Sequence, residues 1–432
     1  MKPTWQTDDG SLSLRRGDCR VILPTFADDS FTACVTDPPY ELAFMGKKWD
    51  ASGVAFQPQT WAEVLRVLKP GAVLLAFGGT RTYHRMTCAI EDAGFEIRDC
   101  IMWVYGSGFP KSLDISKAID KAAGAEREVS GTNPHHRPNH IRPDNAWRGA
   151  EGRPQSPLTS PMLTSPATDS ARLWNGYGTA LKPAVEPIVV AMKPLSGTFA
   201  QNALEHGVAG INVDGGRIVT DETIHQTGEK VDMPRGACAD GYDRPNATMF
   251  RTGKPKERGG PSQPLGRWPA NLIHDGSGEV LAGFPQTVSN GGKGPHKIQA
   301  TDARNANRSA YGDYGATNDF VYGDAGNASR FFYCAKASRA ERGEGNKHPT
   351  VKPLALMEYL VKLVTMPTGT RILDPFAGSG TTLLACYNAF VEAVGIDLEV
   401  DHVDISGGRI AAVANATPLF EKPPAVQREL IP

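Results

Sequence analysis

The chain has 432 residues, of which 40% are hydrophobic and 22% charged, and its formal net charge is −1. This composition is typical of a globular protein with a sizeable core and excludes a chain that is disordered throughout. Residues 1–10 are polar and acidic, and no run of about eighteen apolar residues occurs, so we expect neither a secretory signal nor a membrane span. The expected protein is cytoplasmic and has no membrane partner.

The spacing of cysteines and histidines in the sequence gives little support for disulfide bonds or a metal site. The seven cysteines are an odd number, and none forms a Cys-x-x-Cys pair or has a histidine at zinc-ligand spacing. We interpret them as reduced thiols in the core. His135, His136 and His140 lie in a proline-rich stretch without a carboxylate or cysteine at ligand spacing, so we expect no metal site.

The N-terminal part alternates strand-like and helix-like segments, as βαβ units do. A β-type run at 31–36 precedes apolar residues at helical spacing over 61–68. The wholly apolar run at 72–77 predicts a strand buried on both faces. A helix over 83–90 and a strand over 96–104 are expected next.

The composition then changes, and regular α/β pattern returns near the C-terminus. A β-type run at 186–192 stands between two irregular regions. A helix is predicted to open at Pro353, followed by a strand at 371–373. A glycine-rich turn, a helix over 381–390 and a strand at 393–396 complete another βαβ unit.

The first motif with chemical content is the segment 374–381, Asp-Pro-Phe-Ala-Gly-Ser-Gly-Thr, between a predicted strand and a predicted helix. Its glycines allow close approach to a ligand, and the helix N-terminus offers free N–H groups. Asp397 ends the next strand, where a carboxylate can accept hydrogen bonds from a ribose. Leu383 replaces the third glycine of the dinucleotide fingerprint, so a nucleoside-type cofactor is favoured over a pyrophosphate, with a purely structural turn as the alternative.

The second motif, Asp37-Pro38-Pro39-Tyr40, directly follows the strand at 31–36. The two prolines stiffen the chain and remove backbone donors, leaving a carboxylate, the Pro38 carbonyl and an aromatic ring. A flat base could stack on Tyr40 while Asp37 and the Pro38 carbonyl accept the two hydrogens of its amino group. The alternative is a strand that ends in a Pro-Pro turn with a surface aspartate.

Together the two motifs resemble the amino-group DNA methyltransferases, the S-adenosylmethionine enzymes that modify adenine N6 or cytosine N4. The order of the motifs resembles the β group of that family. Further segments are similar to the family: Gly17-Asp18-Cys19, 63–71 and His348-Pro349-Thr350-Val351-Lys352-Pro353. The segments 106–112 and 266–275 resemble a bacterial and phage-borne branch, which implies a role in restriction-modification.

The resemblance implies an α/β fold, a Rossmann-like S-adenosylmethionine-dependent methyltransferase core with a large irregular insertion. It implies that Asp37, Pro38, Pro39 and Tyr40 are catalytic. It also implies a cofactor pocket formed by Asp18 at the adenine amino group, Asp397 at the ribose, and Thr350, Lys352, Pro353, Asp374, Phe376, Gly378, Gly380 and Thr381. The expected divisions are a catalytic half of the core at 1–131, a Pro/Ser-rich insertion at 132–170, a core strand segment at 171–196, a target-recognition region at 197–329, a cofactor-binding half at 330–416 and a Pro-rich tail at 417–432.

The chemistry of the amino group explains the catalytic motif. The nitrogen is a poor nucleophile because its lone pair is delocalised into the ring, and accepting both N–H hydrogens directs that lone pair at the methyl group. In-line positioning and a place for the proton then suffice. No Pro-Cys pair is present, as a cytosine-C5 enzyme with a thiol nucleophile would need. The base must be flipped out of double-stranded DNA.

The resemblance implies adenine N6 as the target, because the first residue of the motif is Asp37, whereas many β-group N4 enzymes carry serine at that position. Cytosine N4 is the first alternative. RNA or a protein amide is another, although glutamine methyltransferases carry asparagine at that position. A catalytically inactive DNA-binding protein is an alternative of a different class, and no nuclease motif is found. The expected enzyme is a monomer or homodimer that modifies DNA without cleaving it.

Overall fold

The computed structural model describes residues 2–42, 52–106, 108, 112–132, 162–218, 266–289, 324–335 and 351–416. The chain divides into two compact units, one of residues 1–106 and 185–432 and the other of residues 107–184. Among the described helices, none has both the length and the apolar character needed to cross a membrane.

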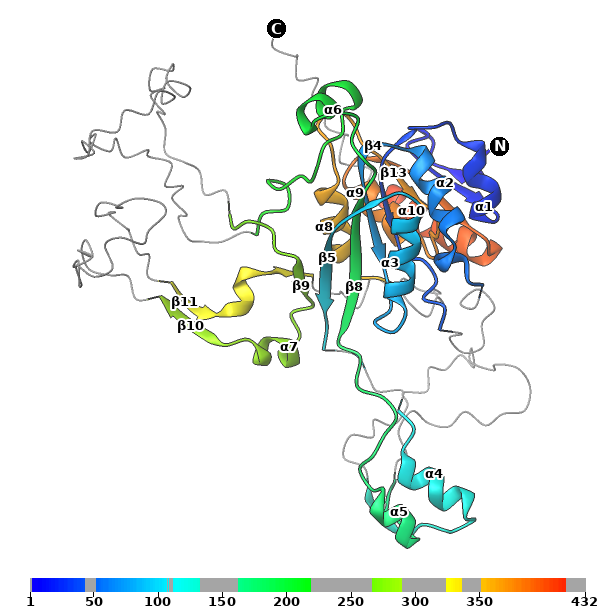
Figure 1. Cartoon of the computed structure of the whole chain (residues 1–432), viewed down its shortest axis with the longest axis vertical. Coiled ribbons are helices and arrows are strands. Elements are labelled where there is room, and N and C mark those ends of the chain that lie inside the picture. Colours follow the sequence, from blue (N-terminus) through cyan, green and yellow to red (C-terminus); the bar gives the residue numbers. More distant parts are fainter. Residues whose placement is uncertain are drawn as a thin grey trace, which may run out of the picture. The chain divides into compact units, whose positions relative to one another are not determined.

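The larger unit is built on a ten-stranded mixed sheet with the order β1-β2-β14-β13-β3-β4-β8-β5-β9-β12 (Figure 1). Strands β2, β14, β13, β3 and β4 are parallel neighbours, whereas β8 lies antiparallel between β4 and β5. The bounds are β1 Trp5–Gln6, β2 Leu12–Arg16, β3 Phe31–Thr36, β4 Leu68–Phe77, β5 Glu96–Val104, β8 Val185–Met192, β9 Leu272–His274, β12 Tyr333–Cys334, β13 Arg371–Asp374 and β14 Glu392–Asp397.

Helices cover both faces of this sheet, because side chains of its central strands alternate between two clusters of buried residues. Ala33 and Val35 of β3 belong to the cluster formed with α8, α9 and α10, whereas Cys34 belongs to the cluster formed with α1, α2 and α3. The bounds are α1 Cys19–Ile22, α2 Pro58–Val67, α3 Tyr83–Asp92, α8 Leu354–Leu363, α9 Thr381–Asn388 and α10 Val400–Ala416. The predicted α/β fold with strands buried on both faces is confirmed.

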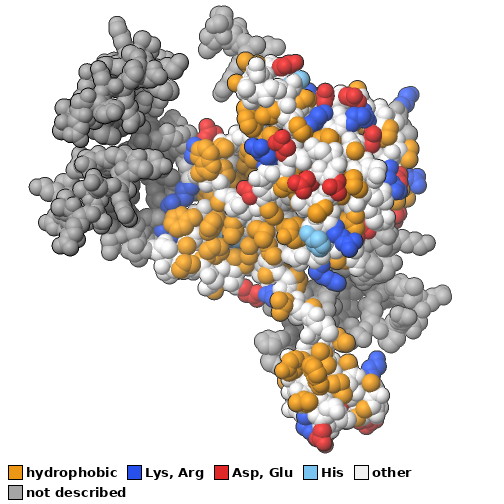
Figure 2. Space-filling model, in the orientation of Figure 1, with side chains coloured by type: hydrophobic (Ala, Val, Ile, Leu, Met, Phe, Trp, Pro, Cys, Tyr) orange, Lys and Arg blue, Asp and Glu red, His pale blue; other side chains and the backbone are white. Residues whose placement is uncertain are grey.

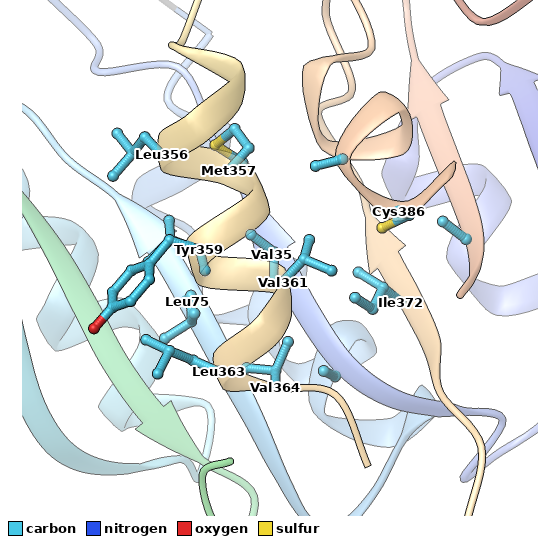
Figure 3. Packing of buried hydrophobic residues seen from close by; sticks show 14 of the residues in the cluster. Val35, Leu75, Leu356, Met357, Tyr359, Val361, Leu363, Val364, Ile372 and Cys386 are labelled. Atoms are coloured by element: carbon cyan, nitrogen blue, oxygen red, sulfur yellow. The ribbon is translucent and has the colours of Figure 1, made fainter. Parts of the chain in front are cut away.

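Helix α8 illustrates the packing. Leu356, Met357 and Val361 of this helix lie in the same cluster as Val35 of β3 and Ile372 of β13 (Figure 3). Burying each such aliphatic side chain stabilises the fold by roughly 1.5–3 kcal/mol. This packing therefore holds the ends of β3 and β13, and the loops that follow them, in fixed positions.

The chain leaves β13 and β3 in opposite directions. From β13 it passes through α9 to β14 on one side, and from β3 it passes through α2 to β4 on the other. Such a reversal between neighbouring parallel strands is the place where open α/β sheets bind ligands, just beyond the carboxyl ends of the strands. These two ends carry the predicted motifs.

The elements that the sequence pattern predicts are present, with one shift in the first half of the chain. The strand expected at 72–77 begins at Leu68, directly after α2, because Leu68 already pairs with Phe31 of β3. Pro353 precedes α8 as its N-cap residue, as predicted for a helix that opens there. Short 3-10 helices lie at Leu23–Thr25, Val54–Phe56 and Ala328–Phe331.

The segment from 197 to 329 contains regular elements that its weak periodicity does not predict. Helix α6 (Phe199–His206) begins with a capping box between Thr198 and Gln201. Strand β9 pairs with β5 and so extends the main sheet. Helix α7 (Gly278–Gly283) follows, and β10 (Gln286–Ser289) pairs antiparallel with β11 (Asp324–Asn327). These elements are too short to show a clear hydrophobic period.

The smaller unit contains α4 (Ile115–Ala122), α5 (Asp169–Leu173), β6 (Val129–Thr132) and β7 (Met162–Thr164). Asp120, which is fully buried, accepts hydrogen bonds from Arg127 at 2.6 Å and from the backbone N–H groups of Ala167 and Thr168 at 3.0 Å. These bonds tie α4 to the segment before α5. Hydrophobic side chains also lie on the surface of this unit (Figure 2).

The cysteines differ from the expectation of a uniformly buried set. All six within the described residues are free thiols. Cys19, Cys34 and Cys386 are buried, but Cys88 on α3 is exposed. Helix α3 directs Met86, Ala89 and Ile90 into the core, so Cys88 lies on its solvent side. Cys238 and the three histidines at 135, 136 and 140 lie outside the described residues.

Candidate active site

The two sequence motifs lie side by side at the ends of neighbouring strands. Asp37 follows β3, and Asp374 is the last residue of β13. Ile372 and Leu373 of β13 pair in parallel register with Ala33 and Cys34 of β3. Segments more than three hundred residues apart in the chain are thereby joined in one site.

The Asp-Pro-Pro-Tyr segment is fixed by contacts at Tyr40. The backbone carbonyl of Tyr40 accepts a hydrogen bond of 2.7 Å from the Thr82 hydroxyl. The phenol of Tyr40 donates to Oε2 of Glu186 at 2.8 Å. A Cβ atom at position 79 would lie 3.0 Å from the Tyr40 ring, so glycine there permits the close approach of the β4–α3 turn.

Lys352 joins this segment from the C-terminal half of the chain. Its Nζ lies 2.8 Å from Oδ2 of Asp37, 3.1 Å from Oε2 of Glu186 and 3.0 Å from the Tyr40 hydroxyl. The Lys352 side chain is only 9% exposed. One ammonium group is thus shared between two carboxylates in a poorly solvated site.

The protonation equilibria of this cluster are strongly perturbed. Burial raises the pKa of Asp37, while the Lys352 ammonium opposes this rise and Glu186 adds to it. Burial alone would lower the pKa of Lys352, but Asp37 and Glu186 hold it above its usual value. Burial also raises the pKa of Tyr40, so the phenol keeps its proton. Perturbations of this kind cluster at functional sites.

Asp37 has one engaged oxygen and one available oxygen. Oδ2 contacts Lys352, whereas the buried Oδ1 has no hydrogen-bond partner among the described residues. An acceptor buried without a partner costs free energy, roughly 1–3 kcal/mol. Such an atom is a candidate for binding a donor on a ligand.

The glycine-rich loop after β13 has a conformation that requires its glycines. Gly378 and Gly380 have positive φ angles of 52° and 77°. A Cβ atom on Gly380 would lie 1.9 Å from the hydroxyl of Ser406 on α10. Arg409 of α10 donates to the carbonyl of Ser379 at 2.6 Å and so holds the loop from the helix side. The loop is therefore rigidly placed at the N-terminus of α9.

Asp397, at the end of β14, is bound to the same loop. Its Oδ2 accepts a hydrogen bond of 2.8 Å from the N–H of Gly378. Its Oδ1 accepts from the N–H of Glu399 at 2.9 Å and lies 3.0 Å from Nδ1 of His402. Burial would lower the pKa of His402, but the bond to Asp397 raises it.

Asp18 reaches the same end of the sheet, because the N–H of Gly17 donates to the carbonyl of Asp397 at 2.8 Å. The Asp18 carboxylate caps α1 and forms an ion pair with Arg20 at 2.6 Å. The bond from Arg20 lowers the pKa of Asp18.

The predicted cofactor residues do not all lie in one place. Asp374, Phe376, Gly378, Gly380 and Thr381 form the loop and the start of α9. Lys352 lies at the Asp-Pro-Pro-Tyr segment, and the preceding Thr350 is outside the described residues. The Pro353 carbonyl accepts the first hydrogen bonds of α8.

Two residues of the cluster were not singled out from the sequence. Glu186 lies near the start of β8, and Tyr105 follows β5. Burial raises the pKa of Tyr105 to about 12, and the nearby negative charge of Glu186 contributes. A carboxylate within the otherwise apolar run 185–192 is the signal that could have identified Glu186.

Comparison with known proteins supports a single family. The N6/N4 DNA methylase family model matches residues 31–150 and 249–407, more than half of the chain. Type II methyltransferase M.ScaI from Streptomyces caespitosus is 40% identical over 82 residues, which are 19% of this chain and 26% of that protein. Type II methyltransferase M2.DpnII from Streptococcus pneumoniae is 41% identical over 66 residues, 15% of this chain and 24% of that protein.

The chain thus spans about a quarter of the length of either curated relative. Among solved structures, the cytosine-N4-specific PvuII DNA methyltransferase is 13% identical, with 96% of this chain and 94% of that chain covered and a TM-score of 0.42.

Proposed function

The chain belongs to the N6/N4 DNA methylase family, and from this premise we propose that it transfers a methyl group from S-adenosylmethionine to the N6 amino group of adenine in double-stranded DNA. The observation that carries the proposal is the state of Asp37. Its Oδ2 is held by Lys352, and its buried Oδ1 has no partner among the described residues. A flipped base would supply the missing donor through its amino group.

Asp37 and the Pro38 carbonyl would accept the two amino hydrogens. Because both acceptors follow β3 directly and Tyr40 is fixed by Thr82 and Glu186, their positions are set before the base arrives. Preorganised acceptors of this kind direct the nitrogen lone pair without a covalent enzyme intermediate. Asp37 is also the nearest place for the proton that the methylated nitrogen must lose.

The loop after β13 fits a nucleoside-type cofactor. Gly378 and Gly380 have positive φ angles and no side chains, so a ligand can approach their backbone closely. Helix α9 begins directly after them. We propose that Asp374, Phe376, Gly378, Gly380 and Thr381 hold S-adenosylmethionine, with Asp397 at the ribose and Asp18 near the adenine ring. When bound, S-adenosylmethionine supplies an electrophilic methyl group on a good leaving group.

Adenine is preferred over cytosine in this proposal because the first motif residue is Asp37, where many similar N4 enzymes carry serine. The segment 197–329 is proposed as the region that recognises the DNA sequence, with 132–170 as an insertion. The similarity to type II methyltransferases supports a modification role in a restriction-modification setting.

The test is to incubate the purified protein with S-adenosylmethionine labelled on its methyl group and with unmethylated genomic DNA. The DNA is digested to nucleosides, and the labelled product is identified by mass spectrometry. N6-methyladenine is the expected product. N4-methylcytosine would correct the base and keep the chemistry. Transfer to RNA or protein but not to DNA would refute the proposed substrate, and no transfer to any of them would favour an inactive DNA-binding protein.

A further inference from the structure

We propose that Lys352 and Glu186 form a positioning pair for Asp37: Lys352 holds Oδ2 of the catalytic carboxylate, and Glu186 anchors Lys352, so that Oδ1 faces the target amino group as a charged acceptor. This inference rests on the proposed function and changes the role expected for Lys352. The sequence motif around Lys352 predicts a cofactor contact, whereas its ammonium group contacts the Asp-Pro-Pro-Tyr segment.

The ammonium group of Lys352 has no free donor for a cofactor. A lysine has three N–H donors, and Nζ lies within 3.1 Å of three acceptors, on Asp37, Glu186 and Tyr40. Its Nζ also lies 5.2 Å from the ring centroid of Tyr40 and 4.9 Å from that of Phe77. These contacts confine the charge to one position beside Asp37.

Glu186 is held by groups of the same cluster. Its Oε2 accepts from both Lys352 and Tyr40, and its negative charge helps to raise the pKa of Tyr105. It reaches this place because β8 inserts antiparallel between β4 and β5, with Glu186 opposite Trp103. With its partners already in the protein, Glu186 is suited to fix Lys352 rather than to bind the base.

The pair has opposing effects on the charge of Asp37. Asp37 is a stronger acceptor for the amino group when it is ionised, and only the ionised form can take up the proton. Lys352 lowers the pKa of Asp37, and Glu186 raises it, against a background of burial. Among the residues that the structure describes, the other titratable groups that face this cluster are Tyr40, Tyr105 and Asp374. Removing each member of the pair should therefore shift the ionisation of Asp37 in a predictable direction.

The experiment measures the single-turnover rate of methyl transfer to DNA as a function of pH for wild type, Lys352→Gln, Lys352→Arg and Glu186→Gln. In Lys352→Gln the acidic limb of the profile should move to higher pH by roughly one unit or more, because the loss of a nearby positive charge raises the pKa of Asp37. In Glu186→Gln the limb should move to lower pH by roughly the same amount, because the loss of a nearby negative charge lowers the pKa of Asp37. Lys352→Arg retains the charge, so the limb should stay in place although the plateau rate falls.

Binding of S-adenosylmethionine, measured by calorimetry, separates this role from a cofactor contact. The Kd for S-adenosylmethionine should change by less than about 3-fold in Lys352→Gln, because the substitution removes no donor that contacts the cofactor. A loss of about 10-fold or more in cofactor affinity, with the acidic limb unmoved, would place Lys352 in the cofactor pocket and overturn the inference.

If all variants transfer the methyl group more slowly but the acidic limb stays at the wild-type pH, the pair has only a structural role, and the inference is likewise refuted. If Lys352→Gln fails to fold, the other two variants still test the inference, because the limb should move to lower pH in Glu186→Gln and should stay in place in Lys352→Arg. A wild-type protein that transfers no methyl group to DNA contradicts the proposed function itself. The two failures are therefore distinguishable.

Discussion

The hydroxyl of Thr36 donates a buried hydrogen bond of 2.7 Å to Oδ1 of Asp374, and so joins the last residue of β3 to the last residue of β13. The same carboxylate oxygen accepts from the N–H of Phe376 at 3.1 Å. The bond from Thr36 therefore holds the Asp-Pro-Pro-Tyr segment and the glycine-rich loop at a fixed spacing. It makes one site of two motifs that are remote in the sequence.

Asp374 should make stability depend on pH in an unusual direction. Burial raises its pKa from 3.8 to about 6, in spite of hydrogen bonds from Thr382 and Thr36 that oppose the rise. A pKa raised in the folded state means that this group stabilises the fold fully below about pH 4 and loses that contribution as pH rises through about 6.

The side chain in Asp374→Asn cannot ionise. We therefore expect the free energy of unfolding of this variant, relative to that of wild type, to increase by roughly 1–3 kcal/mol between about pH 4 and pH 7. Urea unfolding of both proteins at several pH values measures this difference. A difference that stays constant with pH would contradict the raised pKa of Asp374.

Gly380→Ala should disrupt the glycine-rich loop that is proposed to bind S-adenosylmethionine. The new Cβ would meet the Ser406 hydroxyl at 1.9 Å, and φ at this position is +77°. Overpacking and backbone strain together should cost about 2–4 kcal/mol in the free energy of unfolding, and binding of S-adenosylmethionine should weaken by about 10-fold or more.

Gly408→Ala is the matched control. It lies within α10, and a Cβ there meets nothing within 4 Å. This substitution should stabilise the protein by up to about 1 kcal/mol, because alanine favours the helix. Equal effects of the two substitutions would argue against the described loop geometry.

The pair of His402 and Asp397 should stabilise the protein mainly at lower pH. The pKa of His402 is raised in the folded state by its bond to Asp397, although burial opposes this. A raised histidine pKa gives stability that is fully present below about pH 6.5 and is lost as pH rises through the folded-state value.

His402→Gln should consequently lower the free energy of unfolding by roughly 0.5–1 kcal/mol more at about pH 6 than at about pH 9. Chemical denaturation at the two pH values provides the measurement. The exposed His84, substituted in the same way, is the control and should show little effect at either pH. An effect of His402→Gln that is larger at high pH would have the wrong sign for this ion pair.

Cys88 should react with alkylating reagents far faster than the buried thiols. It is exposed on α3, whereas burial raises the pKa of Cys19 to about 12 and also raises the pKa values of Cys34 and Cys386. The thiolate is the reactive form, so burial and a raised pKa both protect a cysteine. Peptide mapping after brief treatment of the native protein with iodoacetamide checks this order. Modification of Cys34 or Cys386 ahead of Cys88 would refute it.

Sequence reasoning located the elements whose hydrophobic period is strong. The runs at β3, β5, β13 and β14 and the helix beginning after Pro353 were predicted at or close to their observed bounds. The two motifs were also recognisable, because a strand followed by a turn of unusual composition fixes where their side chains must emerge.

The partners of those motifs could not be predicted in the same way. Glu186 reaches Lys352 only because β8 inserts antiparallel between β4 and β5. The role of Lys352 likewise depends on which strand end it meets, and that is set by tertiary packing rather than by local pattern. The short elements α6, α7 and β9 leave little periodicity in the sequence; α6 depends on its capping box, and β9 depends on its pairing with β5.

The central claim, that Asp37 is the acceptor on which methyl transfer depends, is tested most directly by the single-turnover transfer rate of Asp37→Asn. The amide has nearly the same shape but lacks the charge and offers a competing N–H donor. We expect the rate to fall by about 100-fold or more, with the Kd for S-adenosylmethionine within about 3-fold of wild type. A variant that methylates DNA at nearly the wild-type rate would contradict the account.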